Sequence, residues 1–374
     1  MSGSVSIAAE RRFGLDVLRA VAITGVVYAH FHAMLPDLLP SVKSGYFGVE
    51  LFFVLSGFLI GGLLLDIAER DPGWRDWLTF MVRRWLRTVP VYLTWTIVLA
   101  LTFPPAEGWT VVLRTLTFTQ NFAWTMPVDN WFGVSWSLTV EEWFYFLFSV
   151  VFLALAVYRP RHAMTAALVL FLFLPLVVRV AAADAGGNWD TTVRKVVVAR
   201  LDAIAYGVLA VALWRKYPAL LHRWRYPLLI VGAVTALGAS FTIPPQGALR
   251  WLIFSLTSAG FALTVPAMVA LRRPRTMIAP VVEWVSTRSY GIYIVHLSLL
   301  LEGSSLLRSL GIAPPWADVA ALALTLAIAD LSWRYFEQPI LRTRPRQFAP
   351  GRGEPIPPLP AFPAAPATVR RSPA

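Results

Sequence analysis

The chain has 374 residues, of which 57% are hydrophobic and only 14% charged, and it contains no cysteine. This composition is too apolar for an ordinary water-soluble enzyme of this length, and the lack of cysteine excludes disulfides, thiolate metal sites and an acyl-cysteine intermediate. The net charge of +12 comes without a nucleic-acid-binding motif. We therefore attribute it to membrane topology and anionic headgroups, and we expect no nucleic-acid partner.

Apolar stretches of about 20 residues, the length that a helix needs to cross a bilayer, recur along the sequence. They lack the alternation of a membrane β-barrel, so the predicted fold class is an all-α integral membrane protein with about ten transmembrane helices. The spans are placed at residues 14–34, 46–65, 83–103, 135–157, 163–183, 196–214, 226–243, 249–270, 286–306 and 315–336. Lys and Arg gather in alternate connections, which predicts that both termini are cytoplasmic.

The same pattern divides the chain into three parts. Residues 1–12 form a cytoplasmic N-terminus, residues 13–342 the transmembrane domain, and residues 343–374 a proline-rich cytoplasmic tail that we expect to be disordered. The first apolar run is long and ends without a small-residue cleavage site, so we interpret it as an uncleaved span.

The first span, LDVLRAVAITGVVYAHFH, carries ionisable groups on one face. At about 100° per residue, Arg19 and His30 are about 20° out of line, and Asp16 lies close to the same stripe. Arg19 and His30 are separated by roughly 16 Å along the helix axis, which places His30 at or beyond mid-membrane. The cost of such groups in hydrocarbon favours a functional role, whereas the alternative is an interfacial Asp16–Arg19 ion pair with His30 packed against a neighbouring helix.

The second and third spans add a packing signal and a basic cluster. Gly57 and Gly61 in LSGFLIGG form a small-xxx-small pair, which predicts close helix packing. In RRWLRTVP, Arg83, Arg84 and Arg87 form a topogenic cluster at the cytoplasmic mouth of the third span. Arg83 and Arg87 share a helical face, so contact with the phosphates of a nucleotide-bearing acyl donor is the second interpretation.

The fourth span begins with SWSLTVEEWFYF, which places two adjacent carboxylates in an apolar segment. Ser137, Glu141 and Tyr145 follow at four-residue spacing and share a face, while Glu142 is rotated by about 100°. A buried carboxylate is a candidate to orient an imidazole or to receive its proton, which makes Glu141 the functional candidate. The alternative is that both carboxylates are solvated at the aqueous end of the helix.

The later spans carry weaker signals. Arg200 and Asp202 in ARLDAIAYG are interpreted as a charge pair near the outer end of the sixth span, either structural or binding a polar acceptor. Tyr293 and His296 in SYGIYIVH share a face, and Glu337 in YFEQP ends the last span. The histidines are too scattered for a dedicated metal site, and no nucleotide-binding glycine loop is present, so we expect no metal and no ATP-driven transport.

These motifs closely resemble, in their order along the chain, the acyltransferase 3 family of integral membrane O-acyltransferases. The resemblance runs from about Phe13 to Arg342, so the transmembrane domain 13–342 is interpreted as an acyltransferase 3 domain. It rests on GLDVLRAVAITGVVYAHF, GYFGVELFFVLSGFLIGGLL, RRWLRTVPVY, VSWSLTVEEWFYFLF, RLDAIAYGVL, SYGIYIVHL and YFEQPILR. The family's Arg, ten residues, His pattern falls on Arg19 and His30, and its Ser-Leu-x-x-Glu-x-x-Phe-Tyr pattern falls on Ser137, Leu138, Glu141, Phe144 and Tyr145.

The resemblance implies transfer of an acyl group, often acetyl, from cytoplasmic acyl-coenzyme A to a hydroxyl of a carbohydrate or glycolipid acceptor, with no tightly bound cofactor. It places the chain in the cell inner membrane as a multi-pass protein. Some family members carry a fused periplasmic SGNH domain. Here the tail follows instead, so a final transfer step that needs such a domain would require a separate periplasmic transferase.

The resemblance also implies roles for the polar residues. His30 acts as general base or carries the acyl group, Glu141 orients it, and Ser137 belongs to the same catalytic group. The acyl donor is bound by four arginines: Arg19, Arg83, Arg84 and Arg87. The remaining polar residues are interpreted as substrate-binding or structural: Asp16, Glu142, Tyr145, Arg200, Asp202, Tyr293 and His296.

The rival hypothesis is a multi-pass transporter or flippase. In such a protein the same buried polar residues would line a translocation path rather than a catalytic site. A transporter would move its substrate without consuming acyl-coenzyme A.

Overall fold

The computed structural model describes residues 12–36, 39, 47–70, 73–126, 131–159, 161–184, 188–243, 247 and 249–346. Within these ranges the chain folds into helices without any β-strand. The first half contains α1 (Phe13–Met34), α2 (Phe47–Ala68), α3 (Trp74–Thr102), α4 (Trp109–Leu116), α5 (Ser135–Tyr158) and α6 (Ala163–Asp184). The second half contains α7 (Leu201–Lys216), α8 (Pro218–Arg223), α9 (Arg225–Thr242), α10 (Ile253–Val269), α11 (Ile278–Ser298), α12 (Ser304–Ser309), α13 (Trp316–Ser332) and α14 (Gln338–Arg342).

Nine helical segments of the described ranges are long and apolar enough to cross a membrane, which confirms the all-α integral membrane fold. The tenth predicted span, 196–214, corresponds to α7. This helix has only 16 residues and follows a short 3-10 helix at Val197–Ala199. Orientation of the termini stays a prediction, and residues 1–11 and 347–374 lie outside the described ranges.

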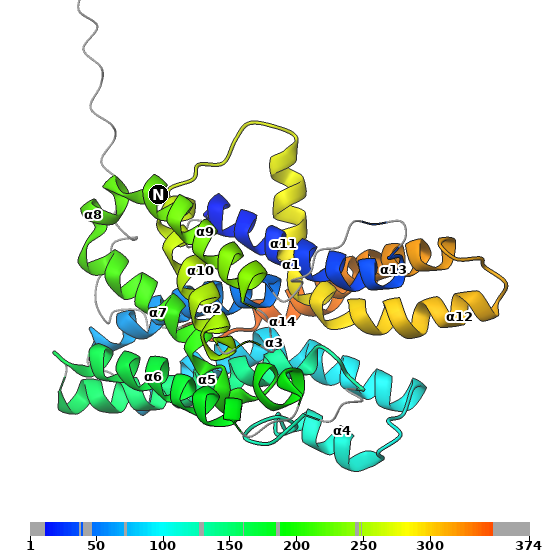
Figure 1. Cartoon of the computed structure of the whole chain (residues 1–374), viewed down its shortest axis with the longest axis horizontal. Helices are drawn as coiled ribbons and strands as arrows, with labels where there is room; N and C mark the ends of the chain where they lie inside the picture. The colour runs from blue at the N-terminus through cyan, green and yellow to red at the C-terminus, as the bar shows by residue number, and fades with distance from the viewer. Residues whose placement is uncertain are drawn as a thin grey trace, which may run out of the picture.

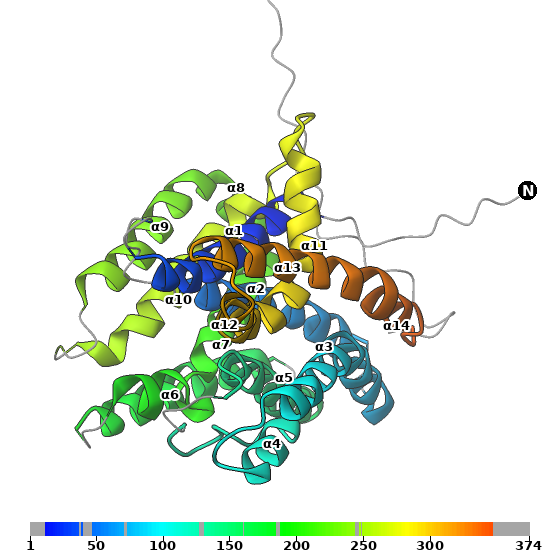
Figure 2. The ribbon, with the colours of Figure 1, turned by 90° about the vertical axis from the view of Figure 1, so that its right-hand side faces the viewer.

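The helices form one bundle around α2 and α7 (Figures 1 and 2). In Figure 2, α9 and α10 lie on one side of this pair and α3 and α14 on the other. The short helices α4 and α12 lie at one end of the molecule, whereas α8 lies at the other (Figure 1). The connections from α3 to α5 and from α11 to α13 therefore lie at the end of the molecule opposite to the connection from α7 to α9.

The close approach of α2 and α7 depends on glycine. A Cβ atom on Gly57 would lie 1.9 Å from the carbonyl oxygen of Ile204, and one on Gly61 would lie 2.8 Å from a methyl of Val211. The facing Gly207 is equally restricted, because its Cβ would lie 2.0 Å from the carbonyl oxygen of Val54. The small-xxx-small prediction is therefore confirmed: α2 contacts another helix almost backbone to backbone.

Three spans differ from the predicted boundaries. Helix α3 begins at Trp74, so the arginine cluster lies inside this helix rather than at its mouth, because the preceding polar residues continue the helix. Helix α11 continues through a π-helical turn, Leu299–Gly303, into α12. Helix α13 continues through a second such turn, Trp333–Glu337, into α14.

Candidate active site

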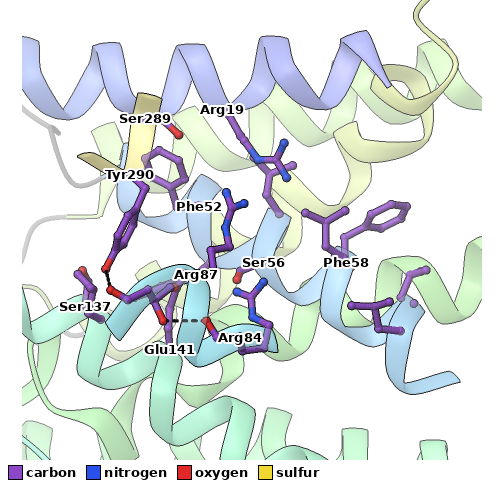
Figure 3. Close-up of a pocket in the computed structure, with 18 of the residues that line it drawn as sticks. Arg19, Phe52, Ser56, Phe58, Arg84, Arg87, Ser137, Glu141, Ser289 and Tyr290 are labelled. Carbon is purple, nitrogen blue, oxygen red and sulfur yellow. Dashed lines mark hydrogen bonds between the residues drawn. The ribbon is translucent and has the colours of Figure 1, made fainter. Parts of the chain in front are cut away.

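A cavity of about 930 Å³ lies between α1, α2, α3, α5, α7 and α11 (Figure 3). This volume lies toward the upper end of the range of small-molecule sites. Of the predicted site residues, the cavity is lined by Arg19, Arg84, Arg87, Ser137, Glu141 and Tyr293, whereas His30 is not among the lining residues. The polar side chains that line it are Arg19, Ser56, Asp66, Glu69, Arg84, Arg87, Thr88, Ser137, Glu141, Arg215, Ser289, Tyr290, Tyr293 and Arg344. Apolar residues of α2, among them Phe52 and Phe58, form much of the remaining wall.

Arginines gather along one part of this cavity. Arg84 donates a hydrogen bond from Nη2 to the Tyr145 hydroxyl at 2.9 Å, and its guanidinium lies 4.6 Å from the centroid of the Tyr145 ring. Arg87 follows one turn later on the same helix and faces the same space (Figure 3). Arg19 reaches the cavity from α1 (Figure 3). Guanidinium groups converging from two helices are suited to a polyanionic ligand.

The structure corrects which arginines of α3 act together. The sequence pattern paired Arg83 with Arg87 on one face, whereas Arg84 and Arg87 line the cavity. Arg83 instead donates a hydrogen bond to the carbonyl of Pro345. Residues three apart on a helix, such as Arg84 and Arg87, share a face as well as residues four apart, such as Arg83 and Arg87. Which pair faces the cavity therefore depends on where the neighbouring helices lie.

Asp16 holds Arg19 in place. Its carboxylate lies 3.7 Å from the Arg19 guanidinium and accepts a hydrogen bond from the Ser286 hydroxyl of α11 at 2.6 Å. Asp16 is buried, with 3% of its surface exposed. Its position indicates a structural role: it positions Arg19 and connects α1 to α11.

The two carboxylates at the start of α5 have different surroundings. Glu141 lines the cavity and interacts with Ser56 and Tyr145, within the field of Arg84 and Arg87. Glu142 is buried and accepts a hydrogen bond from the Thr88 hydroxyl at 2.7 Å. Neither carboxylate is fully exposed at the end of the helix, since Glu141 is half-buried against the cavity and Glu142 is buried. Only Glu141 faces the ligand space.

Ser137 and Tyr293 lie deep in the cavity, where α5 meets α11. Their hydroxyl oxygens are 2.6 Å apart in a buried hydrogen bond. One helical turn further along α11, the ring of His296 lies 5.8 Å from the Tyr293 ring, centroid to centroid. His296 therefore lies behind Tyr293 and is not itself one of the cavity-lining residues.

His296 contacts His30. Its Nε2 atom lies 3.1 Å from Nδ1 of His30, and its Nδ1 lies 2.8 Å from the Tyr293 carbonyl oxygen. A carbonyl only accepts, so His296 carries its proton on Nδ1 and presents an unprotonated Nε2 to His30. His30 then carries its own proton on Nδ1, which leaves its Nε2 as the basic atom. The sequence assigned the orienting role to Glu141, whereas the structure places His296 against the His30 ring.

Arg200 and Asp202 do not pair with each other. Arg200 is bound to Glu50 of α2, while Asp202 accepts two hydrogen bonds from Arg179 of α6, at 2.8 and 2.7 Å. All four side chains are buried. The predicted single charge pair is therefore wrong. Two buried ion pairs connect α2, α6 and α7, and the partners were unpredictable because they come from other helices.

Several cavity residues were missed by the sequence analysis. Arg215, at the end of α7, is bound to Asp66 and lies 3.5 Å from Glu69. Tyr290 and Arg344 also line the cavity. Arg215 and Arg344 looked like ordinary topogenic charges beyond the ends of spans, and no local pattern distinguishes them. Within the described ranges, no cluster of three or more His, Asp or Glu side chains is arranged to hold a metal ion.

The family model of the acyltransferase 3 family, described as an acyltransferase domain, matches residues 12–334. The chain belongs to the acyltransferase 3 family. The match includes α1 through α13, and so every cavity-lining residue except Arg344. The resemblance inferred from the sequence motifs is thereby confirmed.

Two relatives of this family member in sequence carry names of peptidoglycan O-acetyltransferases. Peptidoglycan O-acetyltransferase OatA of Listeria monocytogenes is 24% identical over 87% of this chain and 55% of its own length. A Bacillus subtilis protein named "Putative peptidoglycan O-acetyltransferase YrhL" is 24% identical over 90% of this chain and 56% of its own. The chain thus spans about half the length of these curated relatives. No solved structure gives a significant match.

Proposed function

We propose that this family member is a membrane O-acyltransferase, which moves an acyl group from coenzyme A to a hydroxyl of a carbohydrate acceptor. The observation that carries the proposal is the cavity itself, because one space joins a group of arginines to the Ser137–Tyr293 pair. The two histidines lie behind Tyr293, where the ring of His296 contacts both Tyr293 and His30. The names of the relatives make acetyl the first acyl group to test and a glycan such as peptidoglycan the first acceptor.

The arginine end supports binding of the anionic part of the acyl donor. Arg84 and Arg87 lie near the first half of α3, on the side that the positive-inside rule makes cytoplasmic. Acyl-coenzyme A carries its phosphates at one end and its thioester at the other. Phosphates held by these arginines would direct the extended pantetheine chain toward Ser137 and Tyr293, and toward the histidines.

Behind the Ser137–Tyr293 pair, His30 supplies the acid-base chemistry. Its Nε2 takes the proton of the acceptor hydroxyl as the oxygen attacks the thioester carbonyl, and the same proton then neutralises the departing thiolate of coenzyme A. The sequence left open a second course, in which His30 itself carries the acyl group before the acceptor takes it. Both courses require the unprotonated Nε2 that the contact with His296 provides.

The test uses the full chain reconstituted in proteoliposomes with acetyl-coenzyme A and fragments of a bacterial glycan. Release of coenzyme A and formation of an acetyl ester are measured together. His30→Ala should abolish both, whereas His32→Ala is the matched control, because His32 stacks on Tyr28 elsewhere on α1. Movement of a glycan across the membrane without release of coenzyme A, unaffected by the acyl donor, would support the transporter hypothesis instead.

A further inference from the structure

The segment after α14 forms part of the cavity wall. Helix α14 ends where the Thr343 hydroxyl caps the Ile340 carbonyl at 2.8 Å. Two residues later, the carbonyl of Pro345 accepts a hydrogen bond from Arg83 of α3. The segment 343–346, which was predicted to belong to a disordered tail, is thus bound to α3 through Pro345, and Arg344 lines the cavity.

Arg344 lies among like charges. Its Nε and Nη2 atoms are buried and have no hydrogen-bond partner among the described residues. Burial, together with the nearby guanidinium groups of Arg87, Arg84 and Arg83, lowers the pKa of Arg344 to about 10. By contrast Arg215, on the same cavity, is bound to two carboxylates. An uncompensated cation held against other cations indicates a place for a multiply charged anion.

The position of Arg344 indicates which anion this is. It belongs to a segment outside the last membrane span, whereas Ser137 and Tyr293 lie deep between α5 and α11. In coenzyme A the group most distant from the thioester is the ribose 3′-phosphate, a dianion. A guanidinium at the entrance of the cavity is suited to that group, while Arg84 and Arg87, on α3 inside the membrane span, are suited to the pyrophosphate.

We propose that Arg344 binds the 3′-phosphate of the coenzyme A donor, and that the segment 343–346 completes the nucleotide subsite across the entrance of the cavity. This inference rests on the proposed acyl-coenzyme A chemistry. It assigns a binding residue beyond the part of the chain that the family model matches, which ends at residue 334.

The test compares two ligands that differ in one phosphate, coenzyme A and 3′-dephospho-coenzyme A. Their dissociation constants are measured on the full chain in nanodiscs of zwitterionic lipid. In the wild type, coenzyme A should bind about 10- to 100-fold more tightly, as charge-assisted hydrogen bonds to a phosphate imply. Arg344→Gln should weaken the binding of coenzyme A by about that factor and leave the dissociation constant of 3′-dephospho-coenzyme A unchanged. The variant should then no longer discriminate between the two ligands.

Arg346→Gln is the matched control, because Arg346 is exposed, lies two residues further along the same segment and carries the same charge. Arg346→Gln should alter the dissociation constant of neither ligand. If Arg344→Gln weakens both ligands equally, or leaves the discrimination intact, the 3′-phosphate assignment is wrong. If the wild type binds neither ligand, the proposed acyl donor itself is wrong.

A lipid headgroup is the other source of phosphate near this entrance, and a second set of nanodiscs tests it. These contain phosphatidylglycerol. If this lipid competes with coenzyme A in the wild type but not in Arg344→Gln, the site holds a lipid and the proposal is overturned. Equal discrimination between the two ligands in both lipids supports the donor subsite.

Discussion

The contact between His296 and His30 gives the sharpest prediction about the chemistry. His296→Leu keeps a buried side chain of similar size but removes the acceptor that holds the proton of His30 on Nδ1. The Nδ1–H then loses its partner on α11, at a cost of about 1–3 kcal/mol. If this cost makes the His30 tautomer with a basic Nε2 less stable by the same amount, kcat should decrease by about 5- to 150-fold.

A conservative variant separates this role from a merely structural one. The amide oxygen of Gln can accept the same hydrogen bond, so His296→Gln should restore a substantial part of the lost rate. Because His296 lies beyond the arginines that are proposed to bind the acyl donor, KM for acetyl-coenzyme A should stay close to the wild-type value in both variants. The loss should therefore appear in kcat.

The assay is release of coenzyme A by purified protein in proteoliposomes, at matched protein amounts and after thermal melting has shown that each variant is folded. Unchanged kcat in His296→Leu would refute the tautomer argument. An equal loss in the Gln and Leu variants would also contradict it, because packing rather than hydrogen bonding would then explain the effect.

Three further predictions concern binding and stability. Arg87→Gln should raise KM for acetyl-coenzyme A about tenfold with a smaller effect on kcat, and steady-state kinetics at low and high salt should show a weaker salt dependence than in the wild type. Arg200→Met should destabilise the protein by about 3–5 kcal/mol by leaving Glu50 buried without its cation, whereas the double variant with Glu50→Leu should regain stability in thermal melts. Gly57→Ala should lower the melting temperature and the yield of monodisperse protein, since its Cβ meets a backbone carbonyl, while Gly25→Ala, with nothing within 4 Å, should not. A melting temperature unchanged by Arg200→Met or by Gly57→Ala would contradict the corresponding packing argument.

Sequence and structure agree best where the signal is local. The stripe of Asp16 and Arg19 on the first span follows from the helical period alone, and the structure places the two side chains in contact. The face formed by Ser137 and Glu141 likewise follows from four-residue spacing, and both side chains line the cavity. Whether these residues carry the chemistry stays a prediction that the experiments above address.

The disagreements arise where a side chain has more than one available partner. Arg200 and Asp202 are neighbours on one helix, so pairing them was the simplest local interpretation. The structure instead pairs each with a side chain on another helix, Glu50 and Arg179. Arg83 and Arg84 were equally suited to a ligand by sequence, but in the structure Arg84 lines the cavity and Arg83 donates a hydrogen bond to the Pro345 carbonyl.

By itself the sequence determined the membrane class, the approximate spans, the family, the close packing at Gly57 and the polar face of the first helix. Hydropathy, helical period and motif order are properties of consecutive residues, so they can be determined without knowing which helices pack together. Only the tertiary structure decided that His30 contacts His296, 266 positions away, and that Arg344 joins the arginines of α3. A single helix fixes the direction in which a side chain points, but its partner is set by which other helix packs against that face.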